Sequence, residues 1–182
     1  MSPTGSGAIA TRRIRLATPE DGPFLRAMLY ECAFWHPSQP RPPLDEALAE
    51  PHLTRYIEDW PRVGDAGVIA EDHAGQSVGA AWYRLFLPDA PGYGYLDAAT
   101  PEVSIAVAPG DRGKGIGEAM LTSLLTTART AGIPALSLSV AQTNQAVALY
   151  ERHGFRKVKV EGGSWTMRVD LTKRVATPPV YE

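Results

Sequence analysis

The feature that most constrains this chain is a glycine-rich segment, Arg112-Gly113-Lys114-Gly115-Ile116-Gly117. It follows an alternating, strand-like run over residues 103–107 and precedes apolar residues at helical spacing. The first N–H groups of a helix have no intrahelical partner, and the helix dipole adds positive potential there. The sequence therefore predicts a strand, a tight turn and a helix start that together bind a phosphate-bearing ligand.

Two common phosphate-binding motifs fit this segment poorly. A P-loop needs Gly-x-x-x-x-Gly-Lys-Ser/Thr, but Gly110 is too close to Gly113, and Gly115 stands where the magnesium-binding Ser/Thr would be. A dinucleotide site needs Gly-x-Gly-x-x-Gly and an acidic residue after the next strand. The glycine spacing differs here, and the next strand ends at 139–142 without an acid. ATP and dinucleotides are therefore poorly supported.

Coenzyme A is the third ligand whose pyrophosphate uses such a cradle. The spacing Arg112-x-x-Gly115-x-Gly117 is similar to the Arg/Gln-x-x-Gly-x-Gly/Ala signature of the GCN5-related N-acetyltransferase (GNAT) family. A second block, from Asn144 to Phe155, resembles that family's Asn-x-x-Ala-x-x-Leu-Tyr-x-x-x-Gly-Phe. The resemblance covers about residues 13–170, and its specific motifs lie within 102–155.

The resemblance implies acetyl-CoA as the co-substrate, and the spacing of the histidines predicts no metal site. The turn N–H groups would bind the pyrophosphate. The strand over 105–107 would splay from its neighbour and pair with the pantetheine arm, with the Val107 N–H meeting the thioester carbonyl. Asn144 would contact the cofactor arm, and the Lys114 side chain either contacts phosphate or is solvated. The implied cofactor-binding residues are Ile105, Ala106, Val107, Arg112, Gly113, Lys114, Gly115, Ile116, Gly117, Glu118 and Asn144.

Acetyl transfer to an amine places two further demands on the site. A lysine-like amine with a pKa of about 10.4 is only ~0.1% neutral at pH 7, so a carboxylate must accept its proton. Glu102, at the start of the central strand, is the candidate base, and Asp97 is the rival. The leaving thiolate needs a proton, and the resemblance implies that Tyr150 lies by the sulfur and supplies it.

The function indicated is an acetyl-CoA-dependent N-acetyltransferase, in which the amine of a small molecule or peptide attacks the thioester directly in a ternary complex. The alternative is a CoA-binding sensor or regulatory module of the same fold without turnover. The amine stays open among a lysine, a protein N-terminus, a polyamine, an antibiotic and a small amino acid. The four histidines lack metal-ligand spacing. Candidate residues for an acceptor pocket are Trp35, Trp82, Tyr93 and Tyr95, with core packing favoured for Trp82.

Hydrophobic periodicity predicts an α/β (α+β) fold with a mixed, mostly antiparallel sheet and about four helices, and the resemblance implies a splayed parallel strand pair within that sheet. Helices are expected from Thr18, over 44–60 with an interruption near Pro51, after the glycine turn, and from Asn144. Cys32 lies on the apolar face of the first helix and is expected in the core. The expected strands are 13–16, 67–71, 77–86, 103–107, 136–140, 155–160 and 164–169.

The bulk composition fits one globular domain over residues 13–172, with a flexible tail at 1–12 and another at 173–182. The formal net charge of −2 disfavours nucleic-acid binding. No apolar run approaches the length of a membrane span, and residues 1–10 do not resemble a signal peptide. The single cysteine points to a reducing, cytoplasmic setting. An edge strand near the C-terminus makes a homodimer plausible.

Overall fold

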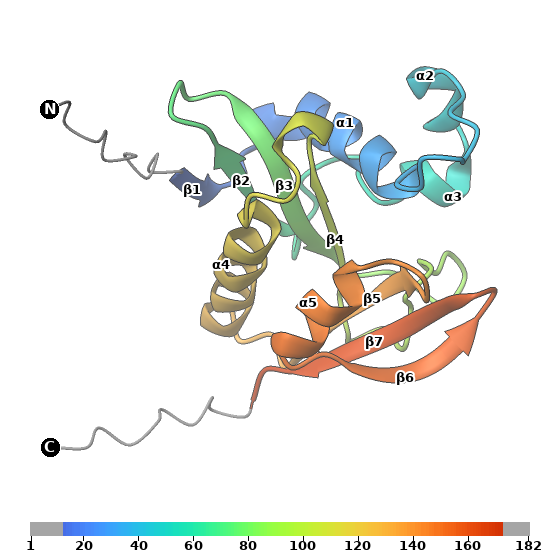
Figure 1. The fold of residues 1–182 in the computed structure, drawn as a ribbon. Coiled ribbons are helices and arrows are strands. Elements are labelled where there is room, and N and C mark those ends of the chain that lie inside the picture. Colours follow the sequence, from blue (N-terminus) through green and yellow to red (C-terminus); the bar gives the residue numbers. More distant parts are fainter. Residues whose placement is uncertain (1–12, 173–182) are drawn as a thin grey trace, which may run out of the picture.

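The computed structural model describes residues 13–172, so both expected tails lie outside the described residues. Its centre is one seven-stranded sheet with the order β1-β2-β3-β4-β5-β7-β6 (Figure 1). Only β4 and β5 pair in parallel, which confirms the predicted mixed sheet. The strands are β1 Arg13–Leu16, β2 Ala66–Glu71, β3 Ser77–Arg84, β4 Glu102–Val107, β5 Ala135–Ala141, β6 Arg156–Glu161 and β7 Ser164–Asp170.

Five α-helices accompany the sheet in the described part of the chain. They are α1 Gly22–Ala33, α2 Leu44–Ala47, α3 Pro51–Thr54, α4 Ile116–Thr130 and α5 Ala146–Arg152. A 3-10 turn over Pro19–Asp21 precedes α1, so the α-helix begins later than the sequence predicted. Between residues 13 and 172, no helix has the length and apolar composition needed to cross a membrane.

The two longest helices, α1 and α4, pack on opposite faces of the sheet (Figure 1). Side chains alternate between the faces of a strand, so adjacent residues of β2 enter different cores. Val68 packs in the core around α4, whereas Ile69 packs in the core around α1. This alternation explains why β2 and β3 are apolar over most of their length and buried on both faces.

The region 44–60 is less helical than the sequence predicted. It contains two single-turn helices, α2 and α3, followed by turns. Pro51 disfavours a helical conformation for the residue before it, and Glu50 is extended, with φ −67° and ψ 123°. The chain therefore bends here, and the segment after α3 lies against the end of β3, where the Trp82 indole N–H donates to the Tyr56 carbonyl at 3.0 Å.

The parallel pair β4–β5 is joined at one end only. Its registered pair is Glu102 with Ser137, and the Ser137 N–H donates to the Pro101 carbonyl at 2.9 Å. Toward Val107 the two strands no longer pair, as expected for the splayed pair. Their separation opens the sheet between α1 and α5.

Candidate functional site

A cleft of about 900 Å³ occupies the gap between β4 and β5. This volume lies within the range of small-molecule sites. Because the gap passes through the sheet, both cores contribute to the walls: Tyr56 and Ala106 come from the core around α1, whereas Val103 and Tyr150 come from the core around α4. Groups separated by the sheet elsewhere can therefore face one ligand here.

Glu102 lies in this cleft at the start of β4 and is only 3% exposed. Its Oε1 accepts a hydrogen bond from the Tyr56 hydroxyl at 2.7 Å, while Oε2 is buried without a hydrogen-bond partner. Burial raises the pKa of this carboxyl to about 7, although the Tyr56 hydroxyl and the Gly94 N–H act in the opposite direction. A carboxyl with a pKa near neutrality is suited to accept a proton at physiological pH.

Asp97, the rival acid, has a different environment. It is exposed, and its carboxylate accepts the Ala99 N–H at 2.9 Å in a local turn. Backbone hydrogen bonds from this turn lower the pKa of Asp97. Asp97 lies outside the cleft walls, so the geometry favours Glu102 over Asp97 as a base.

Tyr150 reaches the cleft from α5 and is 7% exposed. Its ring packs edge-on against Phe155, with the centroids 5.9 Å apart. Burial raises the pKa of its hydroxyl above the usual value for tyrosine. The hydroxyl therefore stays protonated at neutral pH and is available as a donor to a group that develops negative charge beside it.

The glycine turn has the backbone that the sequence predicted. Gly113 and Gly115 have φ values of +74° and +77°, in the left-handed region that favours glycine. Gly115 is the N-cap of α4. Ile116 follows it, and its side chain is 2% exposed in the core around α4, so only its backbone N–H is available to a ligand. Gly117 lines the cleft.

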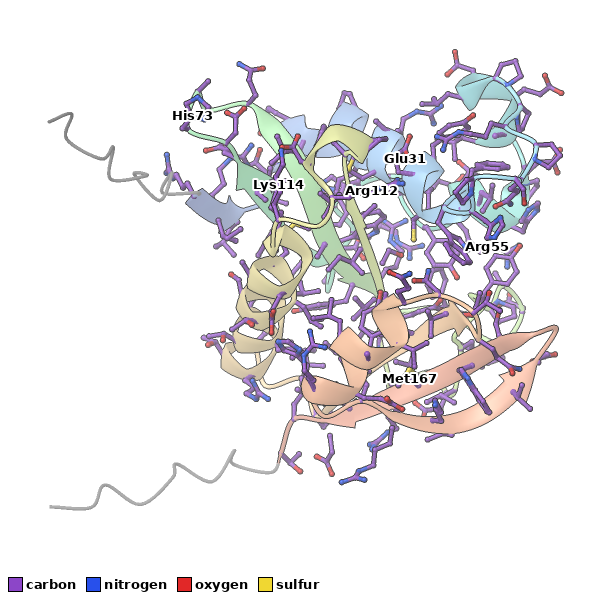
Figure 2. The ribbon with its side chains drawn as sticks, viewed as in Figure 1. Glu31, Arg55, His73, Arg112, Lys114 and Met167 are labelled. Carbon is purple, nitrogen blue, oxygen red and sulfur yellow. The ribbon has the colours of Figure 1, made fainter. Side chains whose placement is uncertain are left out.

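The charged side chains of this turn have partners within the protein. Arg112 donates from Nη2 to Glu31 of α1 at 2.7 Å, and Figure 2 shows the two residues side by side. Arg112 also donates from Nε to the Val107 carbonyl at 3.1 Å. Lys114 donates to Asp111 at 2.8 Å. The backbone N–H groups, more than these side chains, are thus the turn's ready donors for a phosphate.

The first turn of α4 also carries Glu118, whose carboxylate lies 3.9 Å from the Arg152 guanidinium of α5. Both side chains are more than half exposed, so this pair contributes little to stability. For Glu118, as for Ile116, the group that can face a phosphate is the backbone N–H at the helix start.

The three β4 residues expected to bind a cofactor arm, Ile105, Ala106 and Val107, all line the cleft. The Ala108 N–H donates to the Val78 carbonyl of the neighbouring segment at 2.8 Å. Because hydrogen-bonding direction alternates along an antiparallel strand, the N–H groups of Ile105 and Val107 point away from β3 and toward the gap. The Ile105 N–H faces the Cys32 sulfur.

Asn144 lines the cleft and also has a structural role. Its Oδ1 accepts the Ala146 N–H, the first of α5, at 2.9 Å, although the N-cap of the helix is Gln145, one residue later than predicted. Gly154, with φ +88°, follows the other end of the helix. These two residues fix the helix that presents Tyr150.

Several expectations about single residues are corrected or refined. Cys32 packs against the core around α1, as expected, but it is also partly exposed and lines the cleft near the end of α1. Burial raises the pKa of its thiol. Of the aromatic acceptor-pocket candidates, Trp35 and Tyr93 line the cleft, whereas Trp82 is fully buried in the core around α1 and Tyr95 packs against that core.

Sequence reasoning missed three contributors to the site: Tyr56, Gly92 and Glu31. Tyr56 is four residues after His52, which also lines the cleft, but this spacing alone does not separate a site residue from a core residue. Gly92 and Gly94 alternate with tyrosines, a pattern that signals a close backbone approach only when the loop's neighbour is known.

Comparisons with known proteins agree with the geometry. The acetyltransferase (GNAT) family model matches residues 27–155. A mycothiol acetyltransferase of Propionibacterium freudenreichii subsp. shermanii is 32% identical over 117 residues, which are 63% of this chain and 35% of that relative. The match therefore spans about a third of the relative's length.

Two solved structures are similar over most of both chains. One is a ribosomal-protein-alanine N-acetyltransferase from Brucella melitensis, with a TM-score of 0.63, 26% identity and coverage of 87% of this chain and 99% of the other. The second, an acetyltransferase from Salmonella typhimurium with its cofactor acetyl-CoA, has a TM-score of 0.65 at 20% identity, covers 94% and 100% of the two chains, and shows the fold alone. Because the family model covers more than half of the chain, this protein belongs to the GNAT acetyltransferase family.

Proposed function

We propose that this protein is an acetyl-CoA-dependent N-acetyltransferase that acts on the primary amine of a small molecule or peptide. The observation that carries the proposal is the buried Glu102 carboxyl, whose Oε2 makes no hydrogen bond and whose side chain lines the same cleft as Tyr150. Family membership supports the same reaction class.

The residues of the cleft fit acetyl-CoA. The splayed β4 strand directs the Val107 N–H into the gap, where it can pair with an extended amide-bearing arm as an added strand would. The turn from Arg112 to Glu118 offers its N–H groups and the start of α4 to a pyrophosphate. Asn144 lies at the wall between them. Bound acetyl-CoA supplies the activated acyl group as a thioester.

In the proposed mechanism, Glu102 Oε2 accepts the proton that the amine loses as its nitrogen attacks the acyl carbon. The Val107 N–H stabilises the negative charge that develops on the carbonyl oxygen, and one such donor contributes about 3 kcal/mol. Tyr150 donates its proton to the sulfur as the carbon–sulfur bond breaks. Exchange with solvent returns a proton to Tyr150 and removes one from Glu102.

A thiol-release assay tests this proposal. Acetyl-CoA is offered with a panel of amines: a peptide with an N-terminal alanine, a lysine peptide, a polyamine, an aminoglycoside and free amino acids. We expect amine-dependent release of CoA with at least one class, together with the acetylated product by mass spectrometry. Acetyl-CoA binding without release across the whole panel would favour the sensor alternative.

Gly92 provides a separate test, because its backbone lies against the proposed base. A Cβ at this position would overlap Glu102 Oε2 and lie 2.8 Å from the Tyr56 hydroxyl. Gly92→Ala must therefore displace the carboxylate or the loop, and displacements of about 1 Å cost on the order of 100-fold in rate. We expect kcat/KM for the amine to fall by roughly that factor, while acetyl-CoA binding measured by calorimetry is retained.

Gly22→Ala is the matched control for this change. A Cβ at Gly22 meets nothing within 4 Å, and its φ of −46° is helical. Wild-type kinetics in the Gly92→Ala variant would show that the loop does not hold Glu102 in place.

Two further expectations stay predictions. β6 is an edge strand with half-exposed Val158 and Val160, which supports a homodimer through this edge. The single cysteine supports a reducing, cytoplasmic setting.

A further inference from the structure

The Glu102 carboxylate has two oxygens in different environments. Oε1 accepts the Tyr56 hydroxyl at 2.7 Å, and Oε2 has no partner although it is buried. Burying a carboxylate oxygen without a hydrogen bond costs folding free energy. The surrounding protein must therefore hold the carboxylate in this orientation.

The direction of the Tyr56 hydrogen bond is fixed by a second contact. The Tyr93 backbone N–H donates to the Tyr56 oxygen at 2.7 Å. Since an N–H can only donate, the Tyr56 oxygen accepts there, and its own proton points to Glu102 Oε1. The two hydrogen bonds are therefore donated in the same direction: the Tyr93 N–H donates to the Tyr56 oxygen, and the Tyr56 O–H donates to Glu102 Oε1.

Tyr56 is held in place independently of Glu102. Its carbonyl accepts the Trp82 indole N–H at 3.0 Å, and the preceding carbonyl, of Arg55, accepts the buried Arg84 guanidinium at 2.9 Å. Arg84 is itself paired with Asp65 at 2.5 Å, with both side chains at most 2% exposed. The Tyr56 ring packs edge-on against Phe86 at 4.8 Å. Such support makes the hydroxyl a fixed donor.

We propose that Tyr56 is a positioning residue that engages Glu102 Oε1 and thereby leaves Oε2 as the oxygen that receives the proton of the acceptor amine. This inference rests on the proposed function, in which Glu102 is the base. A proton on Oε1 would compete with the Tyr56 hydrogen, whereas Oε2 is free to accept one. Because Oε2 is itself buried, the proton of the acceptor amine is expected to reach it from the cleft, directly or through one water.

Other ionisable groups surround Glu102 and remain unchanged in the test below. Cys32 faces it from α1, and His52 lines the same cleft from α3. Arg84 is opposite Glu102 on β3, but its guanidinium is bonded to Asp65 and the Arg55 carbonyl. Tyr93 and Tyr150 line the cleft from the loop before β4 and from α5.

The test is the pH profile of kcat/KM for the amine in Tyr56→Phe. A hydrogen bond from Tyr56 favours the ionised form of Glu102, so its removal raises the carboxyl pKa. A base must be ionised to act, and the acidic limb of the profile is therefore expected to move up by about 1 pH unit. Activity should approach the wild-type value well above that limb, with KM for acetyl-CoA unchanged.

A second variant gives the opposite sign and keeps the ring and the hydroxyl. Site-specific 3-fluorotyrosine at position 56 makes the phenol a stronger donor, so the acidic limb should move to lower pH. Tyr30→Phe is the matched control, because it removes a hydroxyl hydrogen bond of the same 2.7 Å length, to the Pro42 carbonyl. This control should leave the limb in place.

The outcomes separate the proposal that Glu102 is the base from the proposal that Tyr56 positions it. If Tyr56→Phe lowers the rate equally at every pH, or the fluorinated variant leaves the limb unmoved, Tyr56 only supports the loop and the positioning role is wrong. If Glu102→Gln retains the wild-type limb, Glu102 is not the base and the proposed mechanism fails first. Loss of the limb in Glu102→Gln without a shift in either Tyr56 variant overturns the Tyr56 inference alone.

Discussion

Replacing Glu102 by glutamine is expected to lower kcat/KM for the amine by about 100- to 10,000-fold near neutral pH, the range that general-base catalysis contributes. Glutamine keeps an acceptor for the Tyr56 hydroxyl but puts an NH2 group, which cannot take a proton, where Oε2 lies. The acidic limb that Glu102 imposes near pH 7 should disappear. Residual activity should rise toward higher pH, as the amine itself loses its proton. The measurement is the pH profile of initial rates at saturating acetyl-CoA.

Stability provides the control for Glu102→Gln. Burial raises the carboxyl pKa to about 7 in the folded protein, above the usual value near 4.3 in the unfolded chain. The protonated form therefore favours the folded state, and this contribution is full at low pH and is lost as pH rises through about 7. Glutamine stays neutral, so the variant should be at least as stable as wild type above pH 7 by thermal unfolding. A large activity loss without a stability loss supports Glu102 as the general base. An unaltered pH profile contradicts this role.

Replacing Tyr150 by phenylalanine is expected to reduce kcat by roughly 100-fold or more, because no group then protonates the leaving thiolate. The KM for acetyl-CoA should change little, since the phenylalanine ring keeps the edge-on contact with Phe155. The hydroxyl is buried, and its pKa is raised, so wild-type Tyr150 remains a proton donor across the neutral range. Steady-state kinetics with both substrates varied separates the two effects.

Tyr83→Phe is the matched control for Tyr150→Phe. Tyr83 is buried in the same core around α4 but lies outside the cleft walls. If both variants lose the same activity, the effect comes from core packing. If Tyr150→Phe turns over at the wild-type rate, another group or water protonates the sulfur.

Local spacing was enough to predict the parts of the site that depend on backbone conformation. Gly113 and Gly115 adopt positive φ, and glycine is the residue that does so without a Cβ penalty. The seven strands followed from alternating apolar residues or, for β2 and β3, from short continuous apolar runs. The irregular helical region over 44–60 was predicted with its interruption near Pro51, but only the single-turn helices α2 and α3 form there, and the turns that follow α3 were not predicted.

The chemical type of the candidate residues could also be predicted from the sequence, but the environment of each side chain could not. Glu102 and Tyr56 are 46 residues apart in sequence, and no local pattern links them. Cys32 has the spacing of a core residue, yet α1 ends beside the opened sheet, which turns that position into a cleft wall. Gly92 has an ordinary loop sequence, and it is Glu102, Tyr56 and Phe86, packed against it in the folded protein, that exclude a side chain.

The sequence by itself determined that this chain has a strand, a glycine turn and a helix start suited to an anion, followed by a helix carrying Tyr150. These features rest on interactions within a few residues, which short-range spacing encodes. The tertiary structure decided that β4 and β5 part after Glu102 and that Tyr56 engages one oxygen of the carboxylate. Burial and pairing depend on segments packed from across the chain, so the pKa of Glu102 and the direction of its hydrogen bonds emerge only from the folded protein.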